Sequence, residues 1–555
     1  MPLKSPFQIG IPSTDILSYI FPQGSEPSGQ PLWIDADDTS NSLSPRQLLH
    51  WVKRFAIGLD KLGIRQNEAV MMYTRNHIFI PVFYFAVAGT GRIFTGCNPA
   101  YGVDETTYQL QNTGANLLLV EPMFLDTVLQ AAKKAGLARD RIYLFSDKPC
   151  QTTQGIKDWR TLFGSDDEAE SWQWHGMSQQ ESQRTVAALN YSSGTTGLPK
   201  GVMISHQNIV ANVEQSLYMR NLEQPFRPED APDERWLGFL PLYHAYGQLW
   251  SIVAAAKTLT PCYYMREFQY DKWLGAMQQH RITHIQTAPP VLVMLAKRPE
   301  TEKYDLSSLV NITCGAAPLS KELQNEVSDK LKLKIVQTWG MTELTCSALH
   351  VPGGLDERSG SVGYIDPNCE IKLIDDNGNE VGNGERGEIH VRGPNVCLGY
   401  WRNEEATKNA FDHDGFLKTG DIATRDDRGW HWIVDRKKEL IKVKGYQVPP
   451  AELEAALLEN EHVADAAVCG LQGEYEELPR AYVVLKDASK GRVSPEDIQN
   501  WMARRVARHK RLDGGVKFID EVPKSTSGKI QRVIMRQWAK QDAKDLKIER
   551  SRSKL

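Results

Sequence analysis

The chain has 555 residues, of which 41% are hydrophobic and 24% are charged, and its formal net charge is −4. This length is enough for two or more domains, and the composition is that of a globular protein. The charge argues against a nucleic-acid-binding protein, which would favour a strongly basic face. The eight cysteines include no C-x-x-C pair, which favours reduced thiols and suggests no metal site.

The N-terminal part of the chain contains neither a signal peptide nor a membrane span by its sequence pattern. The opening residues, MPLKSPFQIG, lack the apolar core of a signal peptide. The longest apolar run, residues 78–88, is interrupted by Pro81 and is too short to cross a bilayer. We therefore predict a buried helix there and no transmembrane segment.

Residues 191–202, YSSGTTGLPKGV, are rich in glycine and hydroxyl side chains. The spacing differs from that of a Walker A loop, which leads into a helix, whereas strand-like residues flank this loop on both sides. Glycines allow backbone N–H groups to approach an anion closely, and hydroxyl groups add donors. The candidate phosphate-binding residues are Ser192, Ser193, Gly194, Thr195, Thr196, Gly197 and Lys200. The alternative interpretation is a flexible surface turn.

A strand–helix–strand unit is predicted over residues 309–343. LVNITCG and LKIVQ are strand-like, and Ser320 can cap the helix between them, so the two strands are expected to be parallel. GAAP and TWGMTE follow the carboxyl ends of these strands, where open α/β sheets bind ligands. Trp339 could cover a flat ring there, or it could pack in the core. Glu343 offers a carboxylate suited to magnesium beside phosphates.

Residues 418–454 contain a second group of candidate ligands. KTGDIA places Asp421 where its carboxylate could accept both hydroxyls of a ribose, although aspartate after glycine is also common in turns. The basic run that follows, RKKELIKVK, would ordinarily be a solvated face. Leu440, Ile441 and Val443 interrupt this run, so some of its lysines should point one way.

The last part of the chain is predicted to be a small α+β unit. A helix is expected from Pro449 to Leu458, strands near 463–469, 480–486 and 515–519, and a helix capped at Ser494. We place the domain boundary so that one domain covers 1–437 and the other 438–555. The chain ends in Ser553-Lys554-Leu555, which matches the peroxisomal import tripeptide and predicts a peroxisomal location through the import receptor.

Five of these stretches occur together in the order typical of the adenylate-forming superfamily: YSSGTTGLPKGV, QTWGMTE, KTGD, DRKKELIKVKGYQV and PKSTSGKI. Over nearly its whole length the chain resembles the branch of 4-coumarate–CoA ligases, acyl-CoA synthetases and firefly luciferase. The resemblance implies an α/β fold, with a large N-terminal domain of sheets flanked by helices and a small mobile α+β lid. It also implies two half-reactions: ATP and a carboxylic acid form an acyl adenylate, and coenzyme A then displaces AMP.

The resemblance further implies roles for individual residues. The glycine loop would hold the triphosphate, and Thr342 would contact a phosphate. Glu343 would bind the Mg²⁺, and Asp421 with Arg436 would bind the ribose. The adenine would be framed by Gly315, Ala316, Ala317, Thr338, Trp339, Gly340 and Met341. Lys529 matches the family's adenylation lysine, and Lys438 matches its hinge residue. Lys442 and Gln447 match residues on the thioester-forming face of the lid, and Lys444 with Gly445 matches a coenzyme A contact. His244 matches the gate of the acyl pocket, with Tyr246 and Gly247 behind it, although a core histidine is the alternative.

The sequence departs from its relatives at two places. Many relatives have glycine where this chain has Thr338, whose side chain is expected to occupy space beside the acyl group. Relatives often carry lysine in the segment that here reads YMREF, so Arg266 and Glu267 put that coenzyme A contact in doubt.

We therefore predict an ATP-dependent carboxylic acid–CoA ligase acting on an aryl or a medium-to-long apolar acid, in fatty-acid or specialised metabolism. Two alternatives stay open: an adenylating enzyme that loads a carrier protein, and a luciferase-like oxygenase. A non-catalytic scaffold is disfavoured because Glu343, Asp421, Lys442 and Lys529 are all present.

Overall fold

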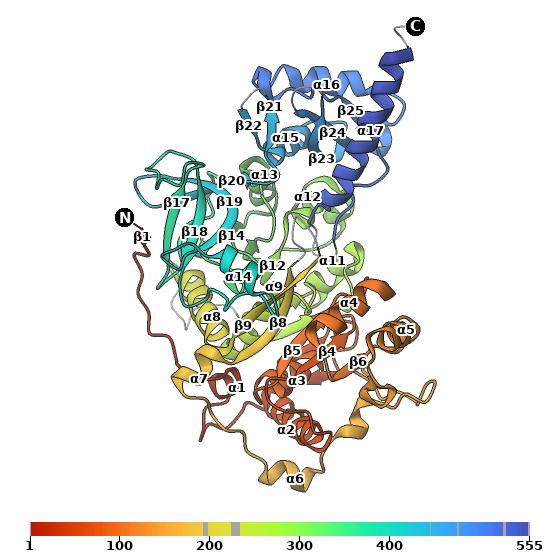
Figure 1. Ribbon diagram of the computed structural model, residues 1–555, viewed down its shortest axis with the longest axis vertical. Coiled ribbons are helices and arrows are strands. Elements are labelled where there is room, and N and C mark those ends of the chain that lie inside the picture. Colours follow the sequence, from red (N-terminus) through yellow and green to blue (C-terminus); the bar gives the residue numbers. More distant parts are fainter. Residues whose placement is uncertain are drawn as a thin grey trace.

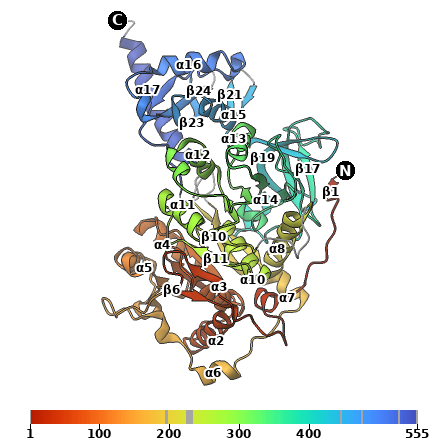
Figure 2. The same ribbon diagram turned by 180° about the vertical axis from the view of Figure 1, so that it is seen from behind.

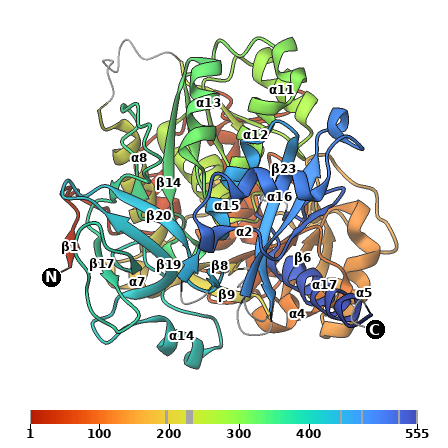
Figure 3. The ribbon, with the colours of Figure 1, turned by 90° about the horizontal axis from the view of Figure 1, so that it is seen from above.

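The computed structural model describes residues 2–192, 198–223, 233–443, 446–473, 477–525 and 529–552, without the side chains of 546–552. Figure 1 shows a large body of sheets and helices, with a smaller unit built from the C-terminal part of the chain at one end of its long axis. The same arrangement is seen from behind in Figure 2. Viewed from above, the C-terminal unit lies over the middle of the larger body (Figure 3). The predicted α/β fold with a separate C-terminal unit is confirmed.

The first sheet of the large body has six strands in the order β7-β6-β4-β5-β8-β9, all parallel except β9. Its strands are β4 (Ala69–Tyr73), β5 (Ile93–Cys97), β6 (Leu117–Val120), β7 (Ile142–Leu144), β8 (Val186–Ser192) and β9 (Lys200–Ser205). Its helices include α2 (Pro45–Lys61), α3 (Ile80–Ala88), α4 (Val103–Thr113) and α5 (Leu125–Ala135). Every residue of α3 is buried, as predicted for the apolar run.

The second sheet has nine strands in the order β16-β15-β14-β13-β12-β10-β11-β2-β3. They are β2 (Trp33–Asp35), β3 (Ser42–Leu43), β10 (Trp236–Gly238), β11 (Cys262–Tyr264), β12 (His284–Thr287), β13 (Asn311–Cys314), β14 (Lys334–Trp339), β15 (Leu349–His350) and β16 (Tyr364–Ile365). Strands β13 and β14 are parallel, and Ser320 caps the helix between them by accepting a hydrogen bond from the Leu323 N–H. The predicted strand–helix–strand unit is confirmed.

Helices accompany this second sheet and a shared core joins it to the first. The helices are α8 (His206–Asn221), α9 (Ala245–Gly247), η5 (Gln248–Ala254), α10 (Ala255–Thr258), α11 (Tyr270–Gln279), α12 (Pro289–Lys297) and α13 (Lys321–Leu331). One buried apolar cluster contains Val70 and Phe94 from the six-stranded sheet as well as Trp33 and Trp236 from the nine-stranded sheet. The two sheets are therefore held in one body by apolar packing.

A third, antiparallel sheet completes the large body, in the order β1-β17-β18-β19-β20. Its strands are β1 (Leu3–Lys4), β17 (Glu370–Ile374), β18 (Gly387–Arg392), β19 (Leu417–Arg425) and β20 (His431–Arg436), with α14 (Glu404–Ala410) beside it. Short helices elsewhere in the body are α1 (Ile16–Ile20), α6 (Asp166–Ser171), α7 (Gln179–Arg184) and η7 (Thr342–Leu344).

The C-terminal unit has its own sheets and its own buried core. Its strands are β21 (Ile441–Val443), β22 (Tyr446–Val448), β23 (Val463–Gln472), β24 (Glu477–Leu485) and β25 (Val516–Phe518). Its helices are α15 (Pro450–Leu458), α16 (Pro495–Ala503) and α17 (Arg532–Arg552). The chain crosses from β20 to β21 through residues 437–440, where the predicted domain boundary falls. The predicted helices at 450 and 495 and the three predicted strands are all confirmed.

All eight cysteines lie in the described part of the chain and are free thiols. Among the described residues, no helix is both long enough and apolar enough to span a membrane.

Candidate active site

The glycine loop joins two antiparallel strands, as its flanking sequence predicts. Ser192 at the end of β8 and Lys200 at the start of β9 are register partners, so the loop leaves and re-enters the sheet at adjacent positions. The loop residues Ser193, Gly194, Thr195, Thr196 and Gly197 lie outside the described residues. The Lys200 Nζ lies 4.9 Å from the centre of the Tyr400 ring.

Glu343 is held by a tyrosine that sequence analysis did not single out. Glu343 follows β14 in the short helix η7 and is only 5% exposed. The Tyr400 hydroxyl donates a hydrogen bond to Glu343 Oε1 at 2.9 Å. Burial, together with the negative charge of Glu343, raises the pKa of Tyr400 well above its ordinary value. Tyr400 thus contacts both the candidate metal carboxylate and the lysine of the glycine loop.

Asp421 and Trp339 form a buried polar pair beside the partly exposed Arg436. The Trp339 Nε1–H donates to Asp421 Oδ2 at 2.9 Å, and Arg436 Nε lies 3.3 Å from Asp421 Oδ1. Asp421 is 6% exposed and lies within β19, where it is the register partner of Arg436, so the turn interpretation is wrong. Its Oδ1 makes no hydrogen bond to another described residue. Burial raises the pKa of the Asp421 carboxyl, and the charge of Arg436 opposes that shift.

The segment that follows β14 folds closely against itself, and the segment that follows β13 contains a strained residue. A Cβ on Gly340 would lie 1.9 Å from the Cys346 carbonyl oxygen, so only glycine fits there. Ala316 has a positive φ of 72°, a left-handed conformation that is uncommon outside glycine and that often occurs at functional sites. Trp339 itself packs in the core of the antiparallel sheet while its N–H reaches Asp421, so it combines both roles that the sequence allowed.

Thr338, Gly315 and Tyr246 come together beside the gate residue His244. A Cβ on Gly315 would lie 2.8 Å from Thr338 Cγ2 and 3.7 Å from the Tyr246 hydroxyl, which itself donates to the Thr313 carbonyl at 3.1 Å. His244 caps the helix α9, with its Nδ1 accepting from the Tyr246 N–H at 3.5 Å. Burial lowers the pKa of His244 to about 3, so its ring is neutral.

The backbone at Gly247 is equally close-packed. A Cβ there would lie 2.4 Å from the Pro241 carbonyl oxygen. The predicted gate residues His244, Tyr246 and Gly247 therefore form one rigid corner next to the end of β13.

Lys529 belongs to the C-terminal unit but shares the electrostatic field of the large body. Burial, together with the positive charge of Arg436, lowers the pKa of Lys529 to about 8. The negative charges of Glu343 and Asp421 act in the opposite direction. Lys529 also contributes to the low pKa of His244. Residues far apart in sequence are thus gathered around one site between the two parts of the molecule.

The other candidate residues of the C-terminal unit lie away from this site. Lys442 is exposed on β21 and pairs in register with Gln447, whose side chain donates to Asp376 Oδ2 of the large body at 3.0 Å. Lys438 is exposed in the turn between β20 and β21. Lys444 and Gly445 lie outside the described residues. Lys529 therefore faces the site while Lys442 faces solvent.

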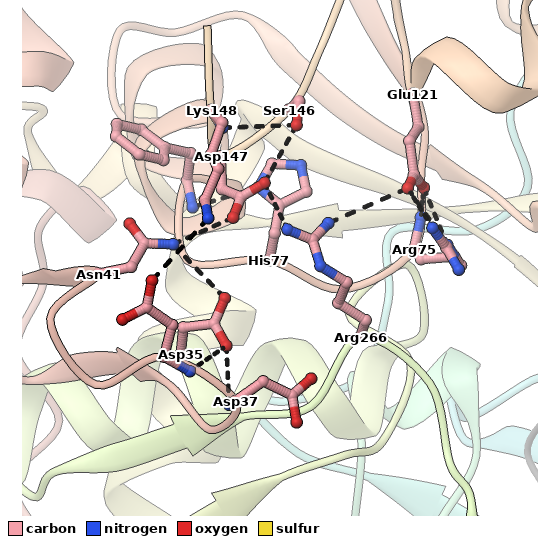
Figure 4. A network of polar contacts seen from close by, with 12 residues as sticks. Asp35, Asp37, Asn41, Arg75, His77, Glu121, Ser146, Asp147, Lys148 and Arg266 are labelled. Carbon is pink, nitrogen blue, oxygen red and sulfur yellow. Dashed lines mark hydrogen bonds and ion pairs between the residues drawn. The ribbon is translucent and has the colours of Figure 1, made fainter.

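Arg266 takes part in a compact ionic network at the carboxyl ends of strands from both large sheets (Figure 4). Arg266 pairs with Asp147 at 2.5 Å and lies 4.0 Å from Glu121. Arg75 pairs with the same Glu121 at 2.6 Å and with Glu267 at 3.4 Å. Because carboxylates already neutralise both arginines, this network agrees with the doubt about a coenzyme A contact at this segment.

The described residues contain no group of three or more histidine, cysteine, aspartate or glutamate side chains that could hold a metal by themselves. Mg²⁺ is commonly bound by one or two carboxylates together with substrate phosphates. Glu343, buried and oriented by Tyr400 beside Lys200, fits such a site.

Comparisons with known proteins agree with this geometry. The family model described as AMP-binding enzyme matches residues 24–401, and the model of the AMP-binding enzyme C-terminal domain matches 452–529. The chain belongs to the adenylate-forming family of AMP-binding enzymes. The second match ends at Lys529, the residue that the C-terminal unit presents to the site.

Relatives of this adenylate-forming enzyme are named as CoA ligases. The acyl-CoA ligase azaF of Aspergillus niger is 36% identical over 95% of this chain and 98% of its own. The phenylacetyl-CoA ligase epaB of the same species is 36% identical over 97% of this chain and 98% of its own. The probable 4-coumarate–CoA ligase 1 of Dictyostelium discoideum is 36% identical over 87% of this chain and 87% of its own. The predicted acid–thiol ligase activity is confirmed at this level.

Solved structures show the same fold. ATP-bound MatB from Rhodopseudomonas palustris superposes with a TM-score of 0.81 at 25% identity, covering 95% of this chain and 99% of that one. The anthranilate CoA ligase AuaEII, in complex with anthranoyl-AMP, superposes with a TM-score of 0.82 at 23% identity, covering 95% of this chain and 98% of that one. This likeness supports the fold.

Proposed function

We propose that this ligase joins an apolar carboxylic acid, aryl or of medium-to-long chain, to coenzyme A through an acyl adenylate. The observation that carries the proposal is the position of Lys529, which shares one electrostatic field with Glu343, Asp421 and His244. The names of the phenylacetyl-CoA and 4-coumarate–CoA ligases among the relatives favour an aryl acid.

The nucleotide is bound by residues of the large body. Asp421 Oδ1, which lacks a hydrogen bond to another described residue, accepts from the ribose hydroxyls, and Arg436 lies beside it. Trp339 orients the Asp421 carboxylate through its N–H. The glycine loop with Lys200 binds the phosphates, and the segments after β13 and β14 frame the adenine, with Thr342 at a phosphate.

Glu343 is the residue that would hold Mg²⁺ together with the phosphates of ATP. When bound, this ion offsets negative charge on the phosphates and so favours departure of pyrophosphate. Tyr400 keeps the Glu343 carboxylate in one orientation.

In the first half-reaction a carboxylate oxygen of the acid attacks the α-phosphorus, and the bond to pyrophosphate breaks. The Lys529 ammonium neutralises the charge that builds between the two reactants, a contribution typical of preorganised electrostatic catalysis. His244 and Tyr246 wall the acyl group, and Thr338 limits the space beside it.

In the second half-reaction the thiol of coenzyme A attacks the acyl carbonyl and AMP leaves. The C-terminal unit turns about Lys438, because the thiol and pyrophosphate cannot occupy the same place. The turn replaces Lys529 with the face that carries Lys442 and Gln447, and Lys444 with Gly445 contacts coenzyme A. We also propose that the protein is peroxisomal, through recognition of Ser553-Lys554-Leu555 by the import receptor.

A panel of aryl and aliphatic acids tests this function. We expect ATP-dependent pyrophosphate release with some of these acids, and acyl-CoA with AMP after coenzyme A is added. Release of pyrophosphate without consumption of the adenylate by coenzyme A would instead indicate a carrier-protein acceptor. Oxygen uptake or light emission by the adenylate would indicate a luciferase-like oxygenase.

A further inference from the structure

Helix α4 contacts both strands that flank the glycine loop. The Tyr108 hydroxyl donates a hydrogen bond to the Pro199 carbonyl at 2.8 Å, immediately before β9. On the other strand, the Tyr191 hydroxyl donates to Asn112 Oδ1 at 2.6 Å. Because Tyr108 and Asn112 are four residues apart on α4, their side chains lie on one face of the helix. This face therefore holds both strands close to the positions where the loop leaves and re-enters the sheet.

The hydrogen bond to Pro199 fixes the peptide unit that leads into Lys200. Proline has no N–H group, so a hydrogen bond can restrain its backbone only through its carbonyl. The peptide unit is planar, so the direction of this carbonyl also sets the direction of the Lys200 N–H. Tyr108 thus restrains the backbone from which the Lys200 side chain leaves β9.

The same end of α4 also holds the segment that contacts the Lys200 side chain. Arg402 Nη1 donates to the Asn112 carbonyl at 3.2 Å. The Tyr400 ring, two residues earlier in that segment, lies 4.9 Å from Lys200 Nζ. The backbone before Lys200 and the ring beside its ammonium are therefore both attached to α4.

The Tyr108 and Asn112 side chains lie outside the packed core. Both are only partly buried, whereas Thr106 and Gln109 of the same helix are buried. The Tyr108 hydroxyl can therefore be removed without opening a cavity in the core. We expect its loss to change the orientation of Lys200 more than the free energy of unfolding.

We propose that Tyr108 is a positioning residue for Lys200, and that Asn112 assists it by holding the opposite strand. The inference rests on the proposed function, in which Lys200 binds the phosphates of ATP. A lysine ammonium is a compact charge on a flexible stem, so the attraction that it offers depends on where its backbone directs it. With the Pro199 carbonyl bound to Tyr108, Lys200 is directed to the phosphates before ATP binds, and less conformational freedom is lost on binding.

Tyr108→Phe removes only the hydroxyl and tests this role. We expect the Kd for Mg-ATP, measured by isothermal titration calorimetry, and the KM for ATP in pyrophosphate release to rise about three- to tenfold. The KM for the acid should change by less than about twofold, because the acid makes no contact with the phosphate site. Thioester formation from synthetic acyl-AMP and coenzyme A should also be unchanged, because acyl-AMP lacks the pyrophosphate half of ATP. A merely structural role would impair both half-reactions together.

Three further variants locate the effect. Asn112→Ala and Tyr191→Phe remove one hydrogen bond from its two ends, so both should raise the Kd for Mg-ATP to a similar extent. If both leave this Kd unchanged, the assisting role of Asn112 is wrong. Tyr270→Phe is the matched control and should leave the Kd unchanged, because the Tyr270 hydroxyl bonds to that of Thr301 at 2.7 Å in another part of the molecule.

A double-mutant cycle shows whether Tyr108 acts through Lys200. In a Lys200→Ala background, Tyr108→Phe should raise the Kd for Mg-ATP no further, because the group that it positions is gone. An undiminished effect in that background, or a change of less than about twofold in Tyr108→Phe alone, would overturn the proposal. The calorimetry needs no acid, so it decides the role of Tyr108 even if no acid releases pyrophosphate. That second result would count against the proposed function alone.

Discussion

Tyr400 connects Glu343 to Lys200: its hydroxyl donates to Glu343 Oε1 at 2.9 Å, and its ring lies 4.9 Å from Lys200 Nζ. This contact places the carboxylate proposed to hold Mg²⁺ beside the lysine of the glycine loop. A residue that orients a metal ligand is commonly worth about 10- to 100-fold in metal affinity or activity.

Tyr400→Phe should therefore weaken the use of Mg²⁺. The variant keeps the ring against Lys200 and removes only the hydrogen bond to Glu343, so the Mg²⁺ concentration for half-maximal pyrophosphate release should rise about tenfold. Tyr19→Phe is the matched control, because Tyr19 donates to Glu214 at 2.7 Å in another part of the molecule. An unchanged Mg²⁺ dependence in Tyr400→Phe would remove Tyr400 from metal positioning.

The two lysines of the C-terminal unit should separate the half-reactions. Lys529 faces the nucleotide residues, so Lys529→Ala should slow adenylation greatly, by a transition-state loss of about 3 kcal/mol or more. Lys442 is exposed in this arrangement, so Lys442→Ala should spare adenylation and slow thioester formation. Synthetic acyl-AMP with coenzyme A isolates the second step, which Lys529→Ala should still perform. Equal failure of both variants in both assays would contradict a turning lid.

The pH dependence of adenylation should report the Lys529 ammonium. Burial lowers the pKa of Lys529 to about 8, so the free enzyme loses this positive charge as the pH rises through that value. We therefore expect kcat/KM for pyrophosphate release to fall above about pH 8. Lys529→Arg should be slower but keep a flat alkaline limb, because arginine stays protonated. A limb near pH 8 that persists in Lys529→Arg would assign the titration to another group.

Asp421→Asn should weaken recognition of the ribose. Its Oδ1 makes no hydrogen bond to another described residue, and the charged carboxylate accepts stronger hydrogen bonds than an amide oxygen. We expect the KM for ATP to rise about tenfold with little change in the KM for the acid. The wild-type enzyme should prefer ATP to 2′-deoxy-ATP, and the variant should lose most of this preference. Retention of the full preference would place the ribose elsewhere.

Import should depend on the final tripeptide Ser553-Lys554-Leu555. A fluorescent protein fused to the N-terminus leaves this tripeptide accessible, and the fusion should collect in peroxisomes. Deletion of the three residues should make the fusion cytosolic. Continued peroxisomal puncta after the deletion would show that another signal directs the protein.

Local patterns in the sequence determined the individual elements and much of their order. Ser320 and Ser494 cap the helices where capping rules predict, because a helix start needs side-chain acceptors for its free N–H groups. The apolar run at 78–88 forms a buried helix, and strands flank the glycine loop, because periodicity and β-branched residues are local signals. The family motifs added the candidate ligands, including Asp421 and Lys529.

Only the tertiary structure decided how these groups act on one another. Tyr400 and Glu343 are 57 residues apart, and Trp339 and Asp421 are 82 apart, so no local pattern joins them. Asp421 follows a glycine as a turn residue would, yet pairing with β20 draws it into a strand beside Arg436. The low pKa of Lys529 arises from burial among distant segments. Burial, unlike helix capping, depends on every element packed around a group, and that information is spread over the whole chain.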